Sequence, residues 1–178
     1  MNKKITFASF LLLICFLANA QEKKYPVIKN GGGIFEVPEA TPLADPKMNY
    51  KIVVEIQKPA DKPDSVNASL DKLARLINLH LAAGIPKKNL DVVAVVHFLG
   101  TPLILSDEAY KKKFGMANPN TKLLNELAEN GVHFYVCGQS LRARHLENET
   151  RNANFKVAQS ALLLLTTMQL KGYSVINP

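Results

Sequence analysis

The sequence predicts an α/β protein with a three-layer α/β/α fold and a mainly parallel sheet of about five strands. From residue 50 onward, strand-like apolar segments alternate with helix-like segments. The segment from Val92 to Val96 is apolar without alternation, which is typical of a parallel strand covered on both faces. Repeated strand-helix alternation implies right-handed crossovers that place helices on both faces of the sheet. The pattern does not give the strand order.

Periodicity, caps and breakers place each element in turn. Strands are expected at Tyr50 to Ile56, Leu90 to His97, Val132 to Val136, Phe155 to Val157 and Tyr173 to Ile176. Helices are expected at Ser65 to Ala83, Asp107 to Phe114, Thr121 to Glu129, Ser140 to Leu146 and Gln159 to Lys171. Asp64 or Ser65 can cap the first helix, and Gly84 ends it. The last helix is apolar on most sides, so we expect it to be buried.

Residues 1–20 have the pattern of a secretory signal peptide. Lys3 and Lys4 precede an apolar run from Ile5 to Leu17, and Ala18-Asn19-Ala20 supplies a small-x-small cleavage pattern. We expect cleavage after Ala20, which makes the mature protein periplasmic or secreted. The apolar run is shorter than the roughly 20 residues that a bilayer span requires, so no membrane anchor is expected.

The mature chain divides into an arm and one domain. Residues 21–49 are rich in Pro, Gly and charge, which predicts an N-terminal arm or hairpin, and residues 50–178 form the domain. Gly31-Gly32-Gly33 is expected to be a turn and not a phosphate loop, because no Lys-Ser/Thr pair follows it. Because the arm has little core of its own, we expect it to lie across a neighbouring subunit of a homo-oligomer.

Composition argues against several classes of function. The formal net charge of +7 at pH 7 is diffuse, and with the predicted export it argues against a nucleic-acid partner. The tight basic run Lys111-Lys112-Lys113 is interpreted as a solvated helix face. The histidines are scattered and have no ligand spacing, so neither a metal nor another cofactor is expected.

Cys137 is the single cysteine that remains once Cys15 leaves with the signal peptide. It lies where a strand ends and a helix begins, and a helix N-terminus offers unpaired amides and partial positive charge that lower a thiol pKa. His97 ends another strand, and the carboxyl ends of parallel strands gather at one edge of a sheet. If the two strands are neighbours, their backbones are about 5 Å apart and the imidazole can approach the sulfur. The alternatives are an inert buried cysteine and a histidine satisfied by a backbone carbonyl.

Several segments together resemble the DsrE/DsrF-like family, over about residues 50–177. These are Val95-Val96-His97, Glu108 to Gly115, Gly131 to Leu141 and Gln169 to Tyr173. The resemblance implies an α/β/α fold in homo- or hetero-oligomers. It also implies that a cysteine at the place of Cys137 accepts and passes on persulfide sulfur. The signal peptide and the arm distinguish this chain from cytoplasmic members, so the fold and the cysteine carry over better than the pathway does.

Two functional hypotheses follow. In the first, an exported sulfurtransferase-like sulfur carrier uses Cys137 as its nucleophile and His97 as an assisting group. Its partner is a sulfur donor or acceptor protein or a small sulfur compound. The residues expected to bind the ligand are Gly138, Gln139, Ser140 and Arg142. In the second, the protein is a non-catalytic oligomeric module that binds a small ligand or a partner, and Cys137 only packs.

Overall fold

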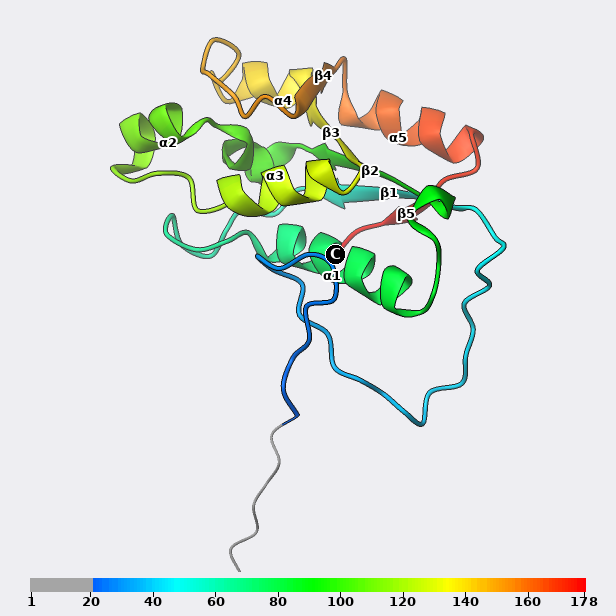
Figure 1. Ribbon diagram of the computed structural model, residues 1–178. Coiled ribbons are helices and arrows are strands. Elements are labelled where there is room, and N and C mark those ends of the chain that lie inside the picture. The colour runs from blue at the N-terminus through cyan, green and yellow to red at the C-terminus, as the bar shows by residue number, and fades with distance from the viewer. Residues whose placement is uncertain (1–20) are drawn as a thin grey trace, which may run out of the picture.

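A computed structural model describes residues 21–178, and its centre is a five-stranded sheet (Figure 1). The strand order is β4-β3-β2-β1-β5, and every neighbouring pair is parallel. The strands are β1 (Tyr50–Ile56), β2 (Leu90–Val96), β3 (Val132–Cys137), β4 (Phe155–Ala158) and β5 (Ser174–Ile176). The predicted α/β fold with a parallel sheet is confirmed.

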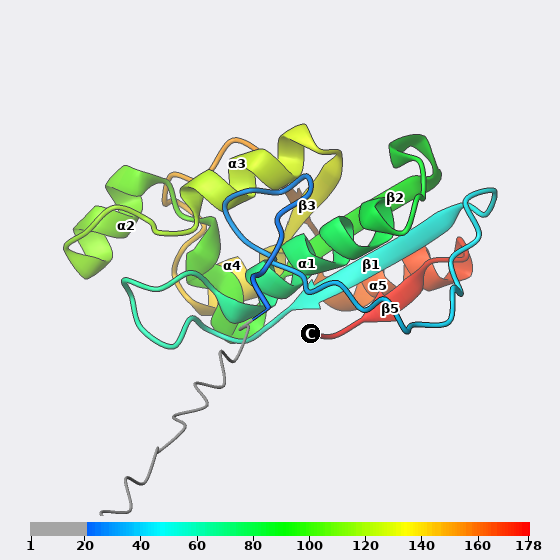
Figure 2. The ribbon, with the colours of Figure 1, turned by 60° about the horizontal axis from the view of Figure 1, so that its bottom comes forward.

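Helices cover both faces of the sheet. The α-helices are α1 (Ala68–Ala82), α2 (Asp107–Phe114), α3 (Thr121–Glu129), α4 (Gly138–Ala143) and α5 (Ala161–Leu170). Two 3-10 helices, η1 (Lys87–Asn89) and η2 (Phe98–Ile104), join α1 to β2 and β2 to α2. Helices α1 and α3 lie on one face, and α5 lies on the other (Figures 1 and 2). We call these the α1/α3 face and the α5 face.

The two faces bury very different amounts of apolar surface. In β2, Val92 and Val96 pack on the α1/α3 face, while Val93 and Val95 pack on the α5 face. All four are at most 3% exposed, which confirms that this strand is covered on both sides. The cluster on the α1/α3 face includes residues from α1, α2, α3 and the strands, whereas the cluster on the α5 face has six buried members. Since each buried aliphatic side chain stabilises the fold by about 1.5–3 kcal/mol, most of the hydrophobic stabilisation lies on the α1/α3 face.

The start of α1 differs from the prediction. The cap is Asn67 and neither Asp64 nor Ser65, and its side chain accepts hydrogen bonds from the amides of Ser69 (2.9 Å) and Leu70 (3.2 Å). Asn67 is itself fixed by a contact with α3. Its backbone amide donates to the side chain of Asn120, the N-cap of α3, at 2.8 Å. A contact across 53 residues therefore selects the cap, and the local sequence pattern does not contain it.

The prediction that the last helix is buried is wrong, because much of α5 is exposed. It packs on the sheet through Ala161 and Leu164, but Leu162, Leu163 and Leu170 are 78%, 52% and 90% exposed. The reason is architectural: α5 has one face against the sheet, and no further layer within residues 21–178 covers its other side. The apolar sequence of α5 therefore forms an exposed apolar surface.

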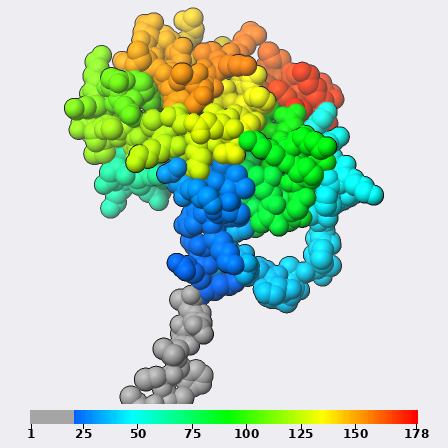
Figure 3. Space-filling model, viewed as in Figure 1, coloured from blue at the N-terminus to red at the C-terminus, as the bar shows by residue number. Residues whose placement is uncertain are grey.

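The beginning of the arm is a short hairpin that packs on its own domain. Lys24 and Ile34 pair as antiparallel backbone, and the chain between them turns through the three glycines. Ile28 is fully buried, and the Asn78 side chain of α1 bonds the Val27 and Ile28 amides and the Ile28 and Gly32 carbonyls. Figure 3 shows this segment against the surface of the domain.

Gly32 makes this contact geometrically feasible. Its φ is +68°, and a Cβ at this position would lie 2.2 Å from the backbone nitrogen of Arg75 in α1. The expected turn is therefore present, but Ile28 and Ile34 of this segment are buried within the chain. These two side chains do not need a neighbouring subunit to cover them.

Within the described residues, no helix is both long and apolar enough to span a bilayer. The predicted signal peptide, residues 1–20, lies outside the part of the chain that the structure describes.

Candidate functional site

The carboxyl edge of the sheet brings Cys137 and His97 onto neighbouring strands. Strands β2 and β3 are parallel partners, with Val96 opposite Val136, so His97 and Cys137 are the next residues along this pair. His97 remains extended, with φ −155° and ψ −178°, so its side chain lies on the same face as that of Val95. Val95 and Cys137 pack in one cluster on the α5 face. Both predicted catalytic residues therefore lie on the α5 face, at the edge where ligands of parallel sheets bind.

The Cys137 thiol is free and 5% exposed, and it lies where β3 ends and α4 begins. Burial on its own raises the pKa of this thiol, but hydrogen bonds from the Ser140 hydroxyl and from the amides of Ser140, Ala161 and Gln139 outweigh it and lower the pKa. Gln139 and Ser140 lie in the first turn of α4, and Ala161 is the first residue of α5. The starts of two helices thus favour the thiolate form.

Gly138 explains how α5 reaches the sulfur. A Cβ at Gly138 would lie 3.0 Å from the carbonyl oxygen of Ala158 and 3.4 Å from that of Gln159. A side chain here would push the β4–α5 connection away from β3. Ser160 then caps α5, since its Oγ accepts from the Leu163 amide at 3.0 Å. The glycine and the cap together place the Ala161 amide at Cys137.

His97 is paired with a carboxylate. Its Nε2 lies 2.8 Å from Oε1 of Glu55 in β1, and the two side chains are 17% and 18% exposed. The Asn177 side chain, which follows β5, donates to the other Glu55 oxygen at 3.0 Å. The alternative of a histidine satisfied by a backbone carbonyl is wrong for Nε2. Sequence reasoning missed Glu55, although a charged residue next to the carboxyl end of an apolar strand is a usable signal.

The residues expected to bind a ligand occupy the start of α4. Ser140 Oγ accepts from the Phe98 amide of η2 at 3.0 Å as well as facing the sulfur. Gln139 Nε2 donates to the Gln159 carbonyl at 3.4 Å. Arg142 is exposed one turn further along α4. The structure thus gathers Gly138, Gln139 and Ser140 around the thiol, and it leaves Arg142 at the surface.

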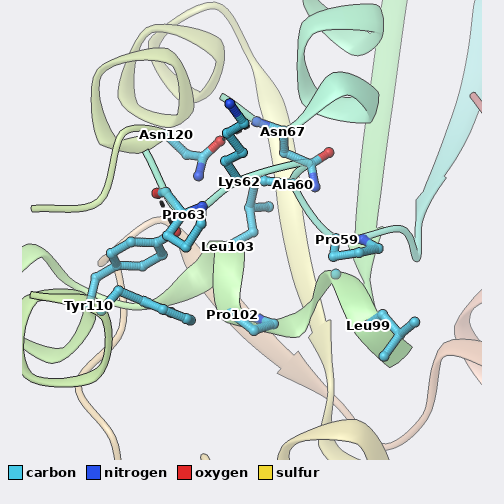
Figure 4. Close-up of a pocket in the computed structure, with 12 residues that line it drawn as sticks. Pro59, Ala60, Lys62, Pro63, Asn67, Leu99, Pro102, Leu103, Tyr110 and Asn120 are labelled. Atoms are coloured by element: carbon cyan, nitrogen blue, oxygen red, sulfur yellow. Dashed lines mark hydrogen bonds between the residues drawn. The ribbon is translucent and has the colours of Figure 1, made fainter. Parts of the chain in front are cut away.

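A cavity of about 240 Å³ is lined in part by residues of η2 (Figure 4). Its wall is mostly apolar and includes Pro63, Leu99 and Tyr110, whose hydroxyl donates to the Pro63 carbonyl at 2.8 Å. Cys137 does not line this cavity. This cavity is therefore not the binding site of a reagent for the thiol.

The parallel sheet between two helix layers places this chain among the three-layer α/β proteins. Its free thiol lies where a strand ends and two helices begin. The model of the DsrE/DsrF-like family matches residues 51–178, so the chain belongs to this family, as its sequence resemblance predicted. Among curated proteins, none matches the chain.

Two solved structures are similar to the chain. One is the protein of unknown function MTH1491 from Methanobacterium thermoautotrophicum, with a TM-score of 0.53 and 18% sequence identity; the match covers 72% of this chain and 99% of that one. The other is the ychN protein from E. coli, with a TM-score of 0.46 and 16% identity, over 72% of this chain and 99% of that one. At this identity, the likeness to the MTH1491 protein concerns the fold alone.

Proposed function

We propose that the protein is an exported sulfurtransferase-like sulfur carrier in which Cys137 accepts a sulfane sulfur, holds it as a persulfide and passes it on. The observation that carries this proposal is the position of the thiol at the carboxyl end of β3, at the start of α4 and beside the first residue of α5. Burial opposes ionisation, yet the Ser140 hydroxyl and three backbone amides lower the pKa of Cys137. Only the thiolate is an effective nucleophile toward sulfur, so this environment favours sulfur chemistry over simple packing. Membership of the DsrE/DsrF-like family supports the same chemistry.

The proposed step needs no oxidant. The Cys137 thiolate attacks the outer sulfur of a persulfide donor, R–S–SH. The new Sγ–S bond forms as the donor S–S bond breaks, and the electron pair of the broken bond leaves on RS⁻. The product is a Cys137 persulfide, and an acceptor thiolate can take its outer sulfur by the same displacement. With thiosulfate as donor, sulfite is the leaving group.

The proposal also covers location and assembly. The signal-peptide pattern of residues 1–20 supports a periplasmic or secreted protein. The exposed apolar surface of α5, formed by Leu162, Leu163 and Leu170, supports a homo-oligomer, because monomers rarely leave such a surface uncovered. The donor or acceptor is then a small sulfur compound or another exported protein. Light scattering on the mature protein tests the assembly, and a monomer would remove this part of the proposal.

The deciding experiment is the pH dependence of Cys137 alkylation in the folded mature protein, combined with intact mass. The expected apparent pKa lies below the ordinary value of about 8.5. After treatment with an alkyl persulfide, the mass should increase by one sulfur atom, and dithiothreitol should remove it. Cys137→Ser is the control and should gain nothing. A thiol that reacts only when the protein unfolds, with no added sulfur, would overturn the proposal.

A second candidate is a binding module in which Cys137 only packs. The specific observation in its favour is the 5% exposure of Cys137 and its packing with Val93, Val95 and Leu164. This candidate predicts that the thiol resists alkylation until unfolding and that Cys137→Ser changes neither fold nor binding. The same alkylation experiment therefore separates the two.

A further inference from the structure

Glu55 is a partly buried carboxylate whose two oxygens are both used. Oε1 pairs with Nε2 of His97 at 2.8 Å, and Oε2 accepts from Asn177 at 3.0 Å. A buried carboxylate is costly unless it is paired and hydrogen-bonded, and the pairing here draws on β1, the end of β2 and the segment after β5. Hydrophobic packing alone would be served better by an apolar residue at position 55. The cluster therefore calls for a chemical explanation.

The pairing fixes which nitrogen of His97 exchanges protons. An ionised carboxylate can only accept hydrogen bonds, so Nε2 must carry a hydrogen in either charge state of the ring. The exchangeable position is then Nδ1, and no residue among 21–178 forms a hydrogen bond with it. When the ring is protonated, Nδ1 carries a hydrogen as well and is a proton donor.

His97 occupies the position at the end of β2 that corresponds to that of Cys137 at the end of β3. His97 and Cys137 follow the paired residues Val96 and Val136 on adjacent parallel strands, about 5 Å apart, and their side chains are on the same face. A group that leaves from a sulfur bound at Cys137 therefore departs beside the imidazole.

We propose that Glu55 is a positioning residue that holds His97 as the proton donor to the thiolate that leaves when Cys137 attacks its substrate. The Sγ–S bond forms, the substrate S–S bond breaks, and its electron pair stays on the leaving sulfur, which takes the Nδ1 proton. His97 changes from imidazolium to neutral imidazole. The inference deepens the proposed function, on which it rests for the identity of the sulfur donor.

The role specifies a substrate class. Alkyl thiolates are basic and leave slowly unless they are protonated, whereas aromatic thiolates leave readily without help. A proton donor at the leaving group therefore suits alkyl persulfides and alkyl disulfides, such as those built on cysteine.

The test uses two uncharged reagents, an alkyl disulfide and an aromatic disulfide, in single-turnover reactions of the full mature protein followed by intact mass. Glu55→Gln keeps the side-chain shape and an acceptor oxygen but removes the charge. We expect it to slow the alkyl reaction about tenfold or more and the aromatic reaction less than about twofold, since positioned proton transfer contributes about 10²–10⁴-fold. His97→Asn should show the same selectivity, and the double variant should be no slower than His97→Asn alone.

Asp91→Asn is the matched control. Asp91 is a partly buried carboxylate in β2 that accepts from the Tyr173 hydroxyl at 2.5 Å, and Tyr173 packs against the cluster of the α5 face, at the opposite end of the strand from His97. Its loss should leave the ratio of the two rates unchanged. If Glu55→Gln does not fold, Asn177→Ala frees Oε2 of Glu55 and should produce a smaller, equally selective slowing.

Three results would overturn the inference: equal slowing of both reactions by Glu55→Gln, no slowing of either, or additive effects of the two substitutions. Failure of Cys137 to gain sulfur from an alkyl persulfide would overturn the proposed function while leaving a selective Glu55 effect on the disulfides intact. A wild-type thiol that reacts with neither disulfide before unfolding would overturn both.

Discussion

The two faces of the sheet differ in the size of their hydrophobic clusters and in the polar groups that they carry. The α1/α3 face holds a large cluster in which Leu70, Leu124 and Phe134 are at most 1% exposed. The α5 face has one helix, a small cluster and an exposed apolar exterior. Cys137 and the Glu55–His97 pair all lie on the α5 face or its edge. The comparison teaches that the fold secures its stability on one side of the sheet and leaves the other side free to carry polar groups.

The arm makes the α1/α3 face bury still more apolar surface than the α5 face. It adds Ile28 to the α1/α3 cluster, and Glu126 of α3 accepts hydrogen bonds from the amides of Lys29 (2.6 Å) and Asn30 (2.9 Å). No segment of residues 21–178 covers α5 in the same way. The arm therefore adds a further layer to the α1/α3 face, and the outer side of α5 stays uncovered.

The largest expected effect comes from matched truncations in the two helix layers. Leu124→Ala in α3 should lower the free energy of unfolding by about 4 kcal/mol, and Leu164→Ala in α5 by about 2 kcal/mol, within the usual range for buried leucines. Leu124 is fully buried, whereas Leu164 is 8% exposed at a thin layer that can relax or admit water. Urea unfolding followed by circular dichroism measures both, and equal losses would break the comparison.

The next effect concerns the attachment of the arm. Asn78→Ala should lower the free energy of unfolding by about 2–3 kcal/mol, because it leaves buried backbone groups of residues 27–32 without partners. Limited proteolysis should then cut within residues 21–36. The control is Asn89→Ala, which removes an exposed bond to the Pro46 carbonyl and should cost less than about 0.5 kcal/mol. An arm that stays protected in Asn78→Ala would show that Asn78 is not its anchor.

A smaller effect on stability, with a large effect on reactivity, is expected at Ser140. Ser140→Ala should cost about 1 kcal/mol or less in unfolding free energy. It should nevertheless raise the apparent pKa of Cys137. Burial raises this pKa, and the variant lacks the Ser140 hydroxyl, which lowers it. Alkylation at a fixed pH below that value becomes slower. Ser174→Ala, in exposed β5, is the control, and an unshifted pH profile in Ser140→Ala would exclude the hydroxyl as a thiolate donor.

The smallest effect is a pH dependence on the α1/α3 face. Burial raises the pKa of Glu126, but hydrogen bonds from Lys29 and Asn30 and the Lys29 charge lower it overall. A carboxyl with a lowered native pKa contributes stability that is complete above its ordinary pKa and is lost as the pH falls through the lowered value. Glu126→Gln should therefore lower the melting temperature slightly at neutral pH, and the difference should vanish in acid. A difference that persists in acid would indicate a packing effect.

Local pattern was sufficient for the strands and for most helices. The continuous apolar run of β2 predicted burial on both faces, and the cysteine at the end of β3 was placed at the correct edge of the sheet. The features that were predicted wrongly or missed depend on contacts between residues that are distant in sequence. The cap of α1 depends on Asn120, the exposure of α5 depends on the number of layers, and the Glu55–His97 pair requires β1 beside β2. Strand order has no local signature, so the site could be predicted only in part.

The bond between Asn177 and Glu55 joins positions 122 residues apart. It cannot form in any fragment that stops before β5. Because β5 pairs with β1 alone among the strands of residues 21–178, the bond requires β5 to have added to the sheet beside β1. Contacts of such long range are entropically expensive and form late in folding. The Glu55 carboxylate therefore has both oxygens hydrogen-bonded only when the domain is complete, and a chain that is still unfolded would carry Cys137 as an ordinary, weakly reactive cysteine.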